Sequence, residues 1–238
     1  MRFEDWEPLY LEILKDMGYD RVKDEESARV LSGIISGMPS SKIASIRMLE
    51  ALVRDRDVLI CGNAPTLEAE LEEVVPNDFC IIAADGAAAV LMDKGVVPHI
   101  IVTDLDGDVE AEIKASQAGA VMVVHGHGDN IPVIRSIVPG LCNVVGSTQA
   151  VPLANVHNFG GFTDGDRCVF LARELGASAI VLIGFDFSDP HVNATKRKKL
   201  EWARKLIDIV LECKAGAMGE GVGAAGAAGD RGLKSQPI

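Results

Sequence analysis

The segment HIIVTDLDGD, residues 99–108, is a short apolar run that ends in three aspartates at alternate positions. An apolar run of this length is typical of a buried β-strand. Similar β-rich runs recur from Asp57 onward and alternate with helical stretches; they are DVLIC (57–61), FCIIAAD (79–85), VMVVHG (121–126), CNVVGS (142–147) and AIVLIGFD (179–186). This alternation predicts a sheet with helices on both faces. We therefore expect an α/β fold with a mostly parallel, doubly wound sheet and an N-terminal helical segment.

The chain divides into three parts that differ in composition and in the spacing of apolar residues. Residues 1–55 carry apolar side chains at helical spacings, and we expect them to form a helical cap packed on the main domain. Residues 56–213 hold the alternating strands and helices, and we expect them to form the main α/β domain. Residues 214–238 are dominated by glycine and alanine, with almost nothing to bury, so this part is expected to be a flexible tail.

Composition excludes several classes of protein. The 48% hydrophobic and 24% charged residues indicate a globular protein, and a net charge of -12 argues against extended contact with nucleic acid. No apolar stretch approaches the roughly 18 residues that span a bilayer, and the acidic N-terminus differs from a signal peptide, so a cytoplasmic protein without membrane contact is expected. The five cysteines lack the paired spacing of zinc or redox sites.

Unusual residues follow the predicted strands. Ligands of open parallel sheets bind outside the carboxyl ends of the strands. The segments expected there are rich in glycine and aspartate; they are GNAPTL (62–67), ADGAAA (84–89), DLDGD (104–108), HGHGDN (125–130), NFGGFTDGDR (158–167) and GFDFSD (184–189). The GNAPTL segment can present free amide groups to phosphate, although such a turn is also common as a purely structural connection. Neither a P-loop nor a GxGxxG dinucleotide fingerprint follows any of the predicted strands, and no GxSxG elbow is found.

The aspartates predict a metal site. Asp104 and Asp106 lie two residues apart, so on extended backbone both carboxylates point to one side, while Asp108 caps the next helix. A simple turn and helix cap is the structural alternative. The same rim is expected to gather further carboxylates, namely Asp85, Asp129, Asp164, Asp166 and Asp186. Without a counter-charge such a group is unfavourable, and Mg²⁺ carrying a polyphosphate resolves the repulsion.

Other polar residues leave two interpretations open. His125 and His127 lie at alternate positions and fit either zinc ligation or neutral contacts with phosphate or a ring edge. Arg167 can pair with the neighbouring aspartates or bind phosphate in a bidentate manner. The basic run KRKK, residues 196–199, is either a solvated helix face or a phosphate contact.

Together these loops identify a family. In order from Asp57 to Cys213, the segments GNAPTL, ADGAAAVL, PHIIVTDLDGD, HGHGDN, GGFTDGDR and GFDFS resemble those of the archaeal 6-hydroxymethyl-7,8-dihydropterin pyrophosphokinases and, more distantly, the thiamine pyrophosphokinases. The resemblance implies Mg²⁺-dependent transfer of diphosphate from ATP to the hydroxymethyl group of a reduced pterin, releasing AMP, on the route to folate or methanopterin-type cofactors. A homodimer is suggested by the thiamine relatives.

The resemblance also implies roles for individual residues. The metal ligands implied are Asp85, Asp104, Asp106 and Asp129, and the residues implied to approach the nucleotide are Gly62, Asn63, Thr66, Thr163, Asp164 and Arg167. Asp106 or Asp129 would accept the hydroxyl proton, and Arg167 would neutralise phosphate charge. HGHGDN lacks the aspartate-rich loop of the thiamine enzymes, which makes thiamine a weaker candidate. A different alcohol as acceptor, or a non-catalytic module that binds a nucleotide or nucleotide sugar, stays open.

Overall fold

The computed structural model describes residues 2–212, which form a seven-stranded sheet in which every neighbouring pair is parallel. The strands are β1 (Asp57–Cys61), β2 (Cys80–Ala84), β3 (Ile100–Thr103), β4 (Val121–Gly126), β5 (Val144–Thr148), β6 (Val156–His157) and β7 (Ala179–Ile183). Their order across the sheet is β6-β5-β4-β3-β2-β1-β7. Each predicted strand is confirmed, whereas the short β6 was not predicted because two residues carry too little apolar pattern.

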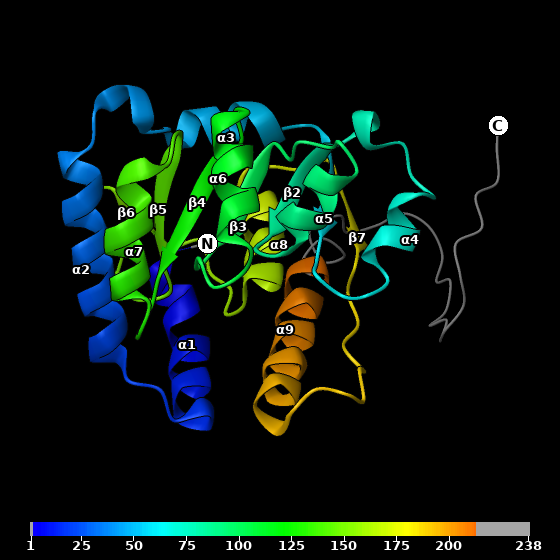
Figure 1. The fold of residues 1–238 in the computed structure, drawn as a ribbon. Coiled ribbons are helices and arrows are strands. Elements are labelled where there is room, and N and C mark those ends of the chain that lie inside the picture. The colour runs from blue at the N-terminus through cyan, green and yellow to red at the C-terminus, as the bar shows by residue number, and fades with distance from the viewer. Residues whose placement is uncertain (1, 213–238) are drawn as a thin grey trace, which may run out of the picture.

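Nine α-helices and three short 3-10 turns surround the sheet within residues 2–212 (Figure 1). The α-helices are α1 (Phe3–Met17), α2 (Arg21–Gly37), α3 (Ile46–Val53), α4 (Leu67–Leu71), α5 (Ala87–Asp93), α6 (Val109–Gln117), α7 (Ile131–Ile137), α8 (Asp164–Glu174) and α9 (Ala194–Glu212). The 3-10 turns are η1 (Ser40–Lys42), η2 (Pro76–Asp78) and η3 (Val138–Gly140). No helix within this range is long and apolar enough to cross a membrane.

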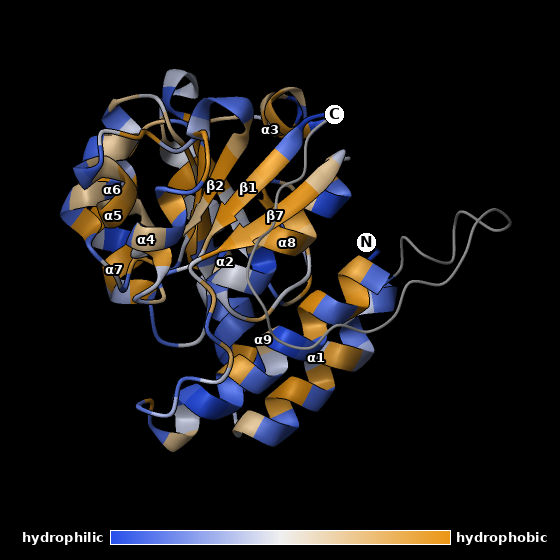
Figure 2. Ribbon diagram, turned by 90° about the vertical axis from the view of Figure 1, so that its right-hand side faces the viewer, coloured by the Kyte–Doolittle hydropathy of each residue, from blue (hydrophilic) through white to orange (hydrophobic). Residues whose placement is uncertain are grey.

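Both faces of the sheet are buried, as a doubly wound fold requires. In β1, Val58 and Ile60 pack into the core cluster that contains α1, α3, α8 and α9. Leu59 and Cys61 point the other way, into the cluster that contains α2, α4, α5, α6 and α7. Because successive side chains of a strand alternate between faces, a strand covered on both sides is apolar at every position. Figure 2 shows β1 and β7 as largely hydrophobic ribbons, with β1 hydrophilic where it begins.

The N-terminal helices share this core. Trp6 on α1 is 1% exposed and packs edge-on against Phe170 of α8, with ring centroids 5.8 Å apart. Its indole Nε1 donates a hydrogen bond to the carbonyl of Gln149 at 2.9 Å. On the opposite face, α2 buries Leu31 and Ile35 against the sheet. The first helices therefore contribute to both core clusters, while the tail predicted for residues 214–238 lies outside the described residues.

The first and last described helices also contact each other. Asp16 near the end of α1 accepts a hydrogen bond from Trp202 Nε1 at 2.8 Å and pairs with Lys198 Nζ at 2.9 Å. Figures 1 and 2 show α1 and α9 side by side, extending beyond the sheet. Helices α1 and α9 therefore pack against each other where they extend beyond the sheet.

Candidate active site

A cavity of about 680 Å³ lies at the carboxyl ends of the strands, where the sequence places its unusual loops. Its floor is formed by residues at or just after the ends of β1, β2, β3, β4, β5 and β7. The turn between α1 and α2 contributes Tyr19 to one wall, and α9 contributes Lys196 and Lys199 to another. Segments from both ends of the described chain therefore enclose a site built on the sheet.

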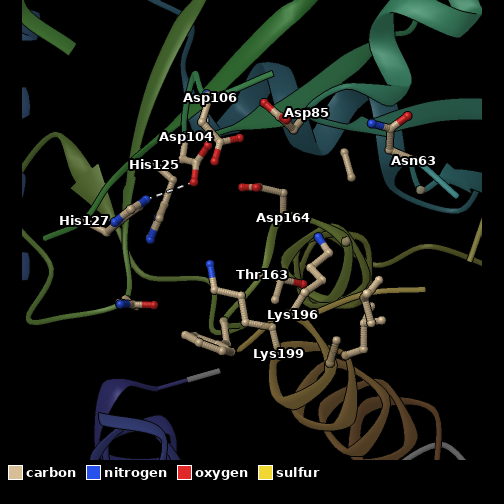
Figure 3. A pocket seen from close by; sticks show the side chains of 18 of the residues that line it. Asn63, Asp85, Asp104, Asp106, His125, His127, Thr163, Asp164, Lys196 and Lys199 are labelled. Carbon is tan, nitrogen blue, oxygen red and sulfur yellow. Dashed lines mark hydrogen bonds and ion pairs between the residues drawn. The ribbon is translucent and has the colours of Figure 1, made fainter. Parts of the chain in front are cut away.

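Three carboxylates meet in the middle of this cavity. Asp85 after β2 and both Asp104 and Asp106 after β3 bring one oxygen each within 4.8 Å of one another (Figure 3). Within residues 2–212 this is the one cluster of three or more side chains suited to hold a metal ion. We call Asp85, Asp104 and Asp106 the acidic triad. The predicted convergence of these three side chains is confirmed.

The backbone conformation that brings Asp104 and Asp106 together differs from the prediction. We expected Asp104 and Asp106 to lie on extended backbone, but Leu105 between them has a left-handed φ of 67°. The Leu105 side chain is 2% exposed and belongs to the core cluster on the face of the sheet that carries α2, α4, α5, α6 and α7. The amide of Asp106 donates to Asp104 Oδ1 at 3.2 Å across it. Asp108 caps α6 as predicted, accepting from the Ala111 amide at 3.0 Å.

Asp85 is held in place from two sides. Its backbone has a φ of 43°, and its carboxylate Oδ1 accepts a hydrogen bond from Thr103 Oγ1 at 2.9 Å. The same hydroxyl oxygen accepts from the Leu105 amide at 2.7 Å. A Cβ atom at Gly107 would clash with the Asp85 carboxylate, so a larger residue there would push that side chain out of its place. The DLDG motif therefore needs its glycine for the close approach of two loops.

The triad crowds negative charge. Burial together with the charges of Asp104 and Asp85 raises the pKa of Asp106 to about 6. Burial and the same two carboxylates also raise the pKa of Asp164, which begins α8 and faces the triad in Figure 3. Behind them, burial raises the pKa of Glu112 to about 8, despite an opposing contact with Thr103. A divalent cation would relieve this repulsion and suits an all-oxygen donor set.

One asparagine fixes the loop after β4. Asn130 donates to the carbonyls of Asp104 (3.0 Å) and His125 (2.7 Å), and its Oδ1 accepts from Ser27 Oγ and the His127 amide. His127 Nε2 in turn lies 2.9 Å from Asp104 Oδ2. Burial works to raise the pKa of Asp104, but the hydrogen bond and charge of His127 together with hydrogen bonds from Asp106 outweigh burial, and the pKa is lowered. This loop therefore orients one member of the triad.

Asp129, the fourth predicted metal ligand, stands apart from the triad. Its side chain is 91% exposed, and Oδ1 lies 3.4 Å from His127 Nδ1. His125 is buried in the cavity wall, and its Nε2 has no hydrogen-bond partner among the described residues. Neither histidine joins a metal-ligating cluster within residues 2–212, so the zinc interpretation gains no support. Asp129 reaches the triad only through His127, and its role as a ligand stays a prediction.

The residues predicted to approach a nucleotide divide into two groups. Gly62, Asn63, Thr163 and Asp164 line the cavity, whereas Thr66 does not. A Cβ atom at Gly62 would lie 2.5 Å from the carbonyl oxygen of Gly184, so the loops after β1 and β7 are in close contact. Four of these predicted positions therefore share one surface.

Arg167 does not face the cavity, contrary to the prediction that it meets phosphate. The side chain is 1% exposed, and its guanidinium donates to the carbonyls of Gly160 at 3.1 Å and Phe162 at 3.2 Å. Its carboxylate neighbour Asp166 is also occupied, accepting hydrogen bonds from the amides of Phe162 and Thr163. The guanidinium therefore supports the loop that leads into α8 through backbone carbonyls. The structural alternative, an ion pair with the neighbouring aspartates, is not found among the described residues.

Several lining residues were not predicted. Tyr19, Lys23 and Asp24 come from the N-terminal helices, in which we found no sign of chemistry. One signal was present, because Asp24 lies on the same buried stripe of α2 as Leu31 and Ile35. A carboxylate on an inward-facing apolar stripe needs partners or a function. Lys196 and Lys199 belong to the basic run whose role was left open, and both now face the cavity.

Comparison with known proteins gives a consistent result. The family model described as 6-hydroxymethylpterin diphosphokinase MptE-like matches residues 38–191. A protein of Methanothermobacter thermautotrophicus named 6-hydroxymethyl-7,8-dihydropterin pyrophosphokinase is 42% identical over 224 residues, covering 87% of this chain and 94% of the relative. Proteins of the same name from Methanocaldococcus jannaschii and Pyrococcus furiosus are 40% and 41% identical, covering 88% and 87% of this chain and 96% and 94% of the relatives. The chain therefore belongs to the MptE-like family of 6-hydroxymethylpterin diphosphokinases and is a diphosphate-transferring enzyme.

Proposed function

We propose that this protein transfers the terminal diphosphate of ATP to the hydroxymethyl group of 6-hydroxymethyl-7,8-dihydropterin, giving AMP and the pterin diphosphate for a folate or methanopterin-type cofactor. The observation that carries the proposal is the acidic triad, three carboxylates within 4.8 Å of one another in a cavity of about 680 Å³. The names of the relatives supply the acceptor. Phosphoryl transfer needs charge neutralisation and positioning more than covalent chemistry, and the site is suited to both.

Mg²⁺ is the proposed metal. Asp85, Asp104 and Asp106 would hold it, since their donors are all carboxylate oxygens, and His127 keeps Asp104 in position. When bound, the ion would neutralise the oxygens of the triphosphate and help to align it. The raised pKa of Asp106 supports the assignment, because the charges of Asp104 and Asp85 that raise it disfavour three ionised carboxylates in the absence of a cation.

The remaining phosphate charge would be met from α9. Lys196 and Lys199 both line the cavity, and Figure 3 shows their side chains extending toward the space below Asp164. Neither lysine makes an ion pair within residues 2–212, unlike Lys198 between them, which pairs with Asp16. Unpaired cations facing an acidic cavity are suited to a bound polyphosphate. They take over the role first predicted for Arg167.

The reaction itself forms one bond and breaks one. The hydroxyl oxygen of the pterin attacks the β-phosphorus of ATP, and the bond from that phosphorus to the oxygen bridging the α- and β-phosphates breaks. AMP leaves with that oxygen, and the hydroxyl proton passes to a carboxylate at the pocket. Asp106 and Asp129 are the proposed acceptors, since both line the cavity and are more exposed than Asp104.

The products distinguish this proposal from its alternatives. Purified protein is incubated with ATP, Mg²⁺ and either 6-hydroxymethyl-7,8-dihydropterin, thiamine or no acceptor, and nucleotides are separated by chromatography with mass detection. We expect AMP in equal amount to pterin diphosphate, and only with the pterin. ADP as the sole nucleotide product would overturn diphosphate transfer. Binding of ATP without turnover of any acceptor would favour a nucleotide-binding module instead.

A further inference from the structure

The cavity has two chemically different ends, set by the strand order. Because β4 and β5 lie on one side of β3 and β2, and β1 and β7 on the other, the acidic triad occupies the middle. We call the region lined by Tyr19, Asp24, His125, Gln149 and Phe162 the β4–β5 end. The region lined by Asn63, Gly184, Phe185, Phe187 and Val192 is the β1–β7 end.

Buried polar side chains gather at one end only. Of the cavity-lining residues that carry a buried polar side chain, each lies at the β4–β5 end: Asp24 is 3% exposed, His125 is 2% exposed and Gln149 is 4% exposed. At the β1–β7 end the polar lining side chains Asn63 and Asp186 are exposed. Directional hydrogen-bonding groups shielded from water recognise a ligand edge inserted deeply among them.

The orientation of Gln149 follows from Asp24. The Asp24 carboxylate accepts hydrogen bonds from Tyr10 Oη at 2.8 Å, from the Gly128 amide at 2.8 Å and from Gln149 Nε2 at 2.7 Å. An ionised carboxylate only accepts, so the amide nitrogen of Gln149 must face it. Gln149 Oε1 then has no hydrogen-bond partner within residues 2–212. It offers an acceptor to a ligand that carries N–H groups.

His125 supplies a second unsatisfied group. Its Nδ1 lies 3.4 Å from Ser147 Oγ, whereas Nε2 is buried without a partner among the described residues. Figure 3 shows the imidazole extending from β4 into the cavity beside His127. Burial lowers the pKa of His125 well below its ordinary value, so the ring is neutral. A buried imidazole nitrogen left unpaired costs free energy that a bound polar edge recovers.

Two aromatic side chains also line the cavity. The rings of Tyr19 and Phe162 lie 6.2 Å apart at an interplanar angle of 48°, and both line the cavity. Tyr19 is 41% exposed in the structure, so a bound ring system has an aromatic face available. The β4–β5 end therefore combines an aromatic face with buried hydrogen-bonding groups at its rim.

We propose that the β4–β5 end binds the bicyclic ring of the pterin acceptor, with Gln149 Oε1 and His125 Nε2 on its polar edge and Tyr19 against its face, while the nucleoside occupies the β1–β7 end. The inference rests on the proposed function. In-line attack at the β-phosphorus places the entering hydroxyl and the departing AMP on opposite sides of the reacting centre, so the two substrates need opposite ends of the cavity. A flat ring whose edge carries both N–H donors and acceptors matches the end with the buried polar groups.

The test measures the two ligands separately. Calorimetry with 6-hydroxymethyl-7,8-dihydropterin, and with the α,β-methylene analogue of ATP plus Mg²⁺, gives two dissociation constants, each repeated with the other ligand saturating. We expect Tyr19→Ser and Gln149→Met each to weaken pterin binding on the order of tenfold and to change nucleotide binding less than about twofold. Tyr19→Phe, which keeps the ring, restores pterin binding. Asn63→Ala at the β1–β7 end weakens the nucleotide analogue instead.

Two other results for Tyr19→Ser would contradict the assignment of the pterin to the β4–β5 end. If Tyr19→Ser weakens the nucleotide analogue and spares the pterin, the two ends are exchanged. If neither ligand responds to Tyr19→Ser, the β4–β5 end is not a substrate subsite; this variant alters an exposed ring and does not depend on the fate of the buried Gln149. Failure of the proposed function is read independently, as absence of AMP formation by the unaltered protein with ATP and the pterin alcohol.

Discussion

Asp24 and the acidic triad border the same cavity but differ in how many hydrogen bonds their carboxylate oxygens accept. Asp24 accepts three hydrogen bonds from the protein, donated by Tyr10, Gln149 and the Gly128 amide. The acidic triad instead brings three carboxylates within 4.8 Å of one another. The first is stabilised by the fold itself, because every donor belongs to the chain. Under the proposed function, the second is completed by a bound cation.

The number of hydrogen bonds that a carboxylate accepts from the protein separates structural carboxylates from candidate metal ligands more reliably than its position in the cavity does. Asp24 is 3% exposed and lines the cavity, so position alone would make it a candidate ligand. Its three donors argue instead for a supporting role, orienting Gln149 and the loop at Gly128. The acidic triad has fewer donors than oxygens and adds mutual repulsion. Four changes test the contrast, beginning with the largest expected effect.

Removing a member of the triad should abolish catalysis and spare the fold. We expect Asp104→Ala to lower kcat/KM on the order of 10³-fold, because a bound cation would lose a ligand at the reacting phosphate. Excess Mg²⁺ should not restore activity, and the circular dichroism spectrum should match that of the unaltered protein. Asp93→Ala, an exposed carboxylate on α5, is the matched control and should retain activity. Full turnover by Asp104→Ala would remove the metal role of the triad.

Removing Asp24 should mainly lower stability, which is the opposite of the result expected for the acidic triad. Asp24→Ala leaves Tyr10 Oη and Gln149 Nε2 without their acceptor in a buried region, and we expect the free energy of unfolding to fall by about 3 kcal/mol. Urea denaturation followed by tryptophan fluorescence measures this change. Glu26→Ala, on the exposed side of the same helix, should change stability by less than about 0.5 kcal/mol. Equal stabilities of the two variants would mean that Asp24 is not a structural carboxylate.

The lysines of α9 should show an intermediate effect on nucleotide affinity. We expect Lys196→Gln and Lys199→Gln each to raise the KM for ATP about tenfold, since each removes a charge-assisted contact with phosphate. The matched control is Arg197→Gln, which removes a charge on the same turn that contacts the Pro190 carbonyl outside the cavity. Steady-state kinetics at saturating pterin gives the comparison. Similar KM values for all three variants would assign the basic run to a solvated helix face.

The smallest expected effect is a change in the pH dependence of stability. Burial and the charges of Asp104 and Asp85 raise the pKa of Asp106 from 3.8 to about 6 in the metal-free protein. Between these values the folded protein keeps a proton that the unfolded chain has lost, so raising the pH destabilises the folded state. Urea midpoints measured with EDTA at pH 4 to 7 should fall less steeply for Asp106→Asn. An unchanged slope would show that Asp106 ionises without hindrance.

The sequence was sufficient for the fold because the strands are covered on both faces, which makes each a continuous apolar run. It also predicted the three carboxylates of the triad, since the loops after parallel strands meet at one edge. It did not predict the left-handed turn at Leu105, whose side chain lies buried in a core cluster built from segments distant in the sequence. Nor could it reveal that Arg167 is occupied by two backbone carbonyls. The contacts of Asp24 with Gly128 and Gln149 join residues more than 100 positions apart, which a local sequence pattern does not reveal.

The contacts of Asp16 with Lys198 and Trp202 join parts of the chain separated by 182 and 186 positions. A chain trimmed to the segment that matches the family model, residues 38–191, would retain every carboxylate of the triad yet lose α1, α2 and α9. Tyr19, Lys196 and Lys199 would go with them, so the cavity would lose lining residues from both ends of the described chain. Truncations and fusion tags for biochemical work should therefore leave residues 3–212 intact at both ends.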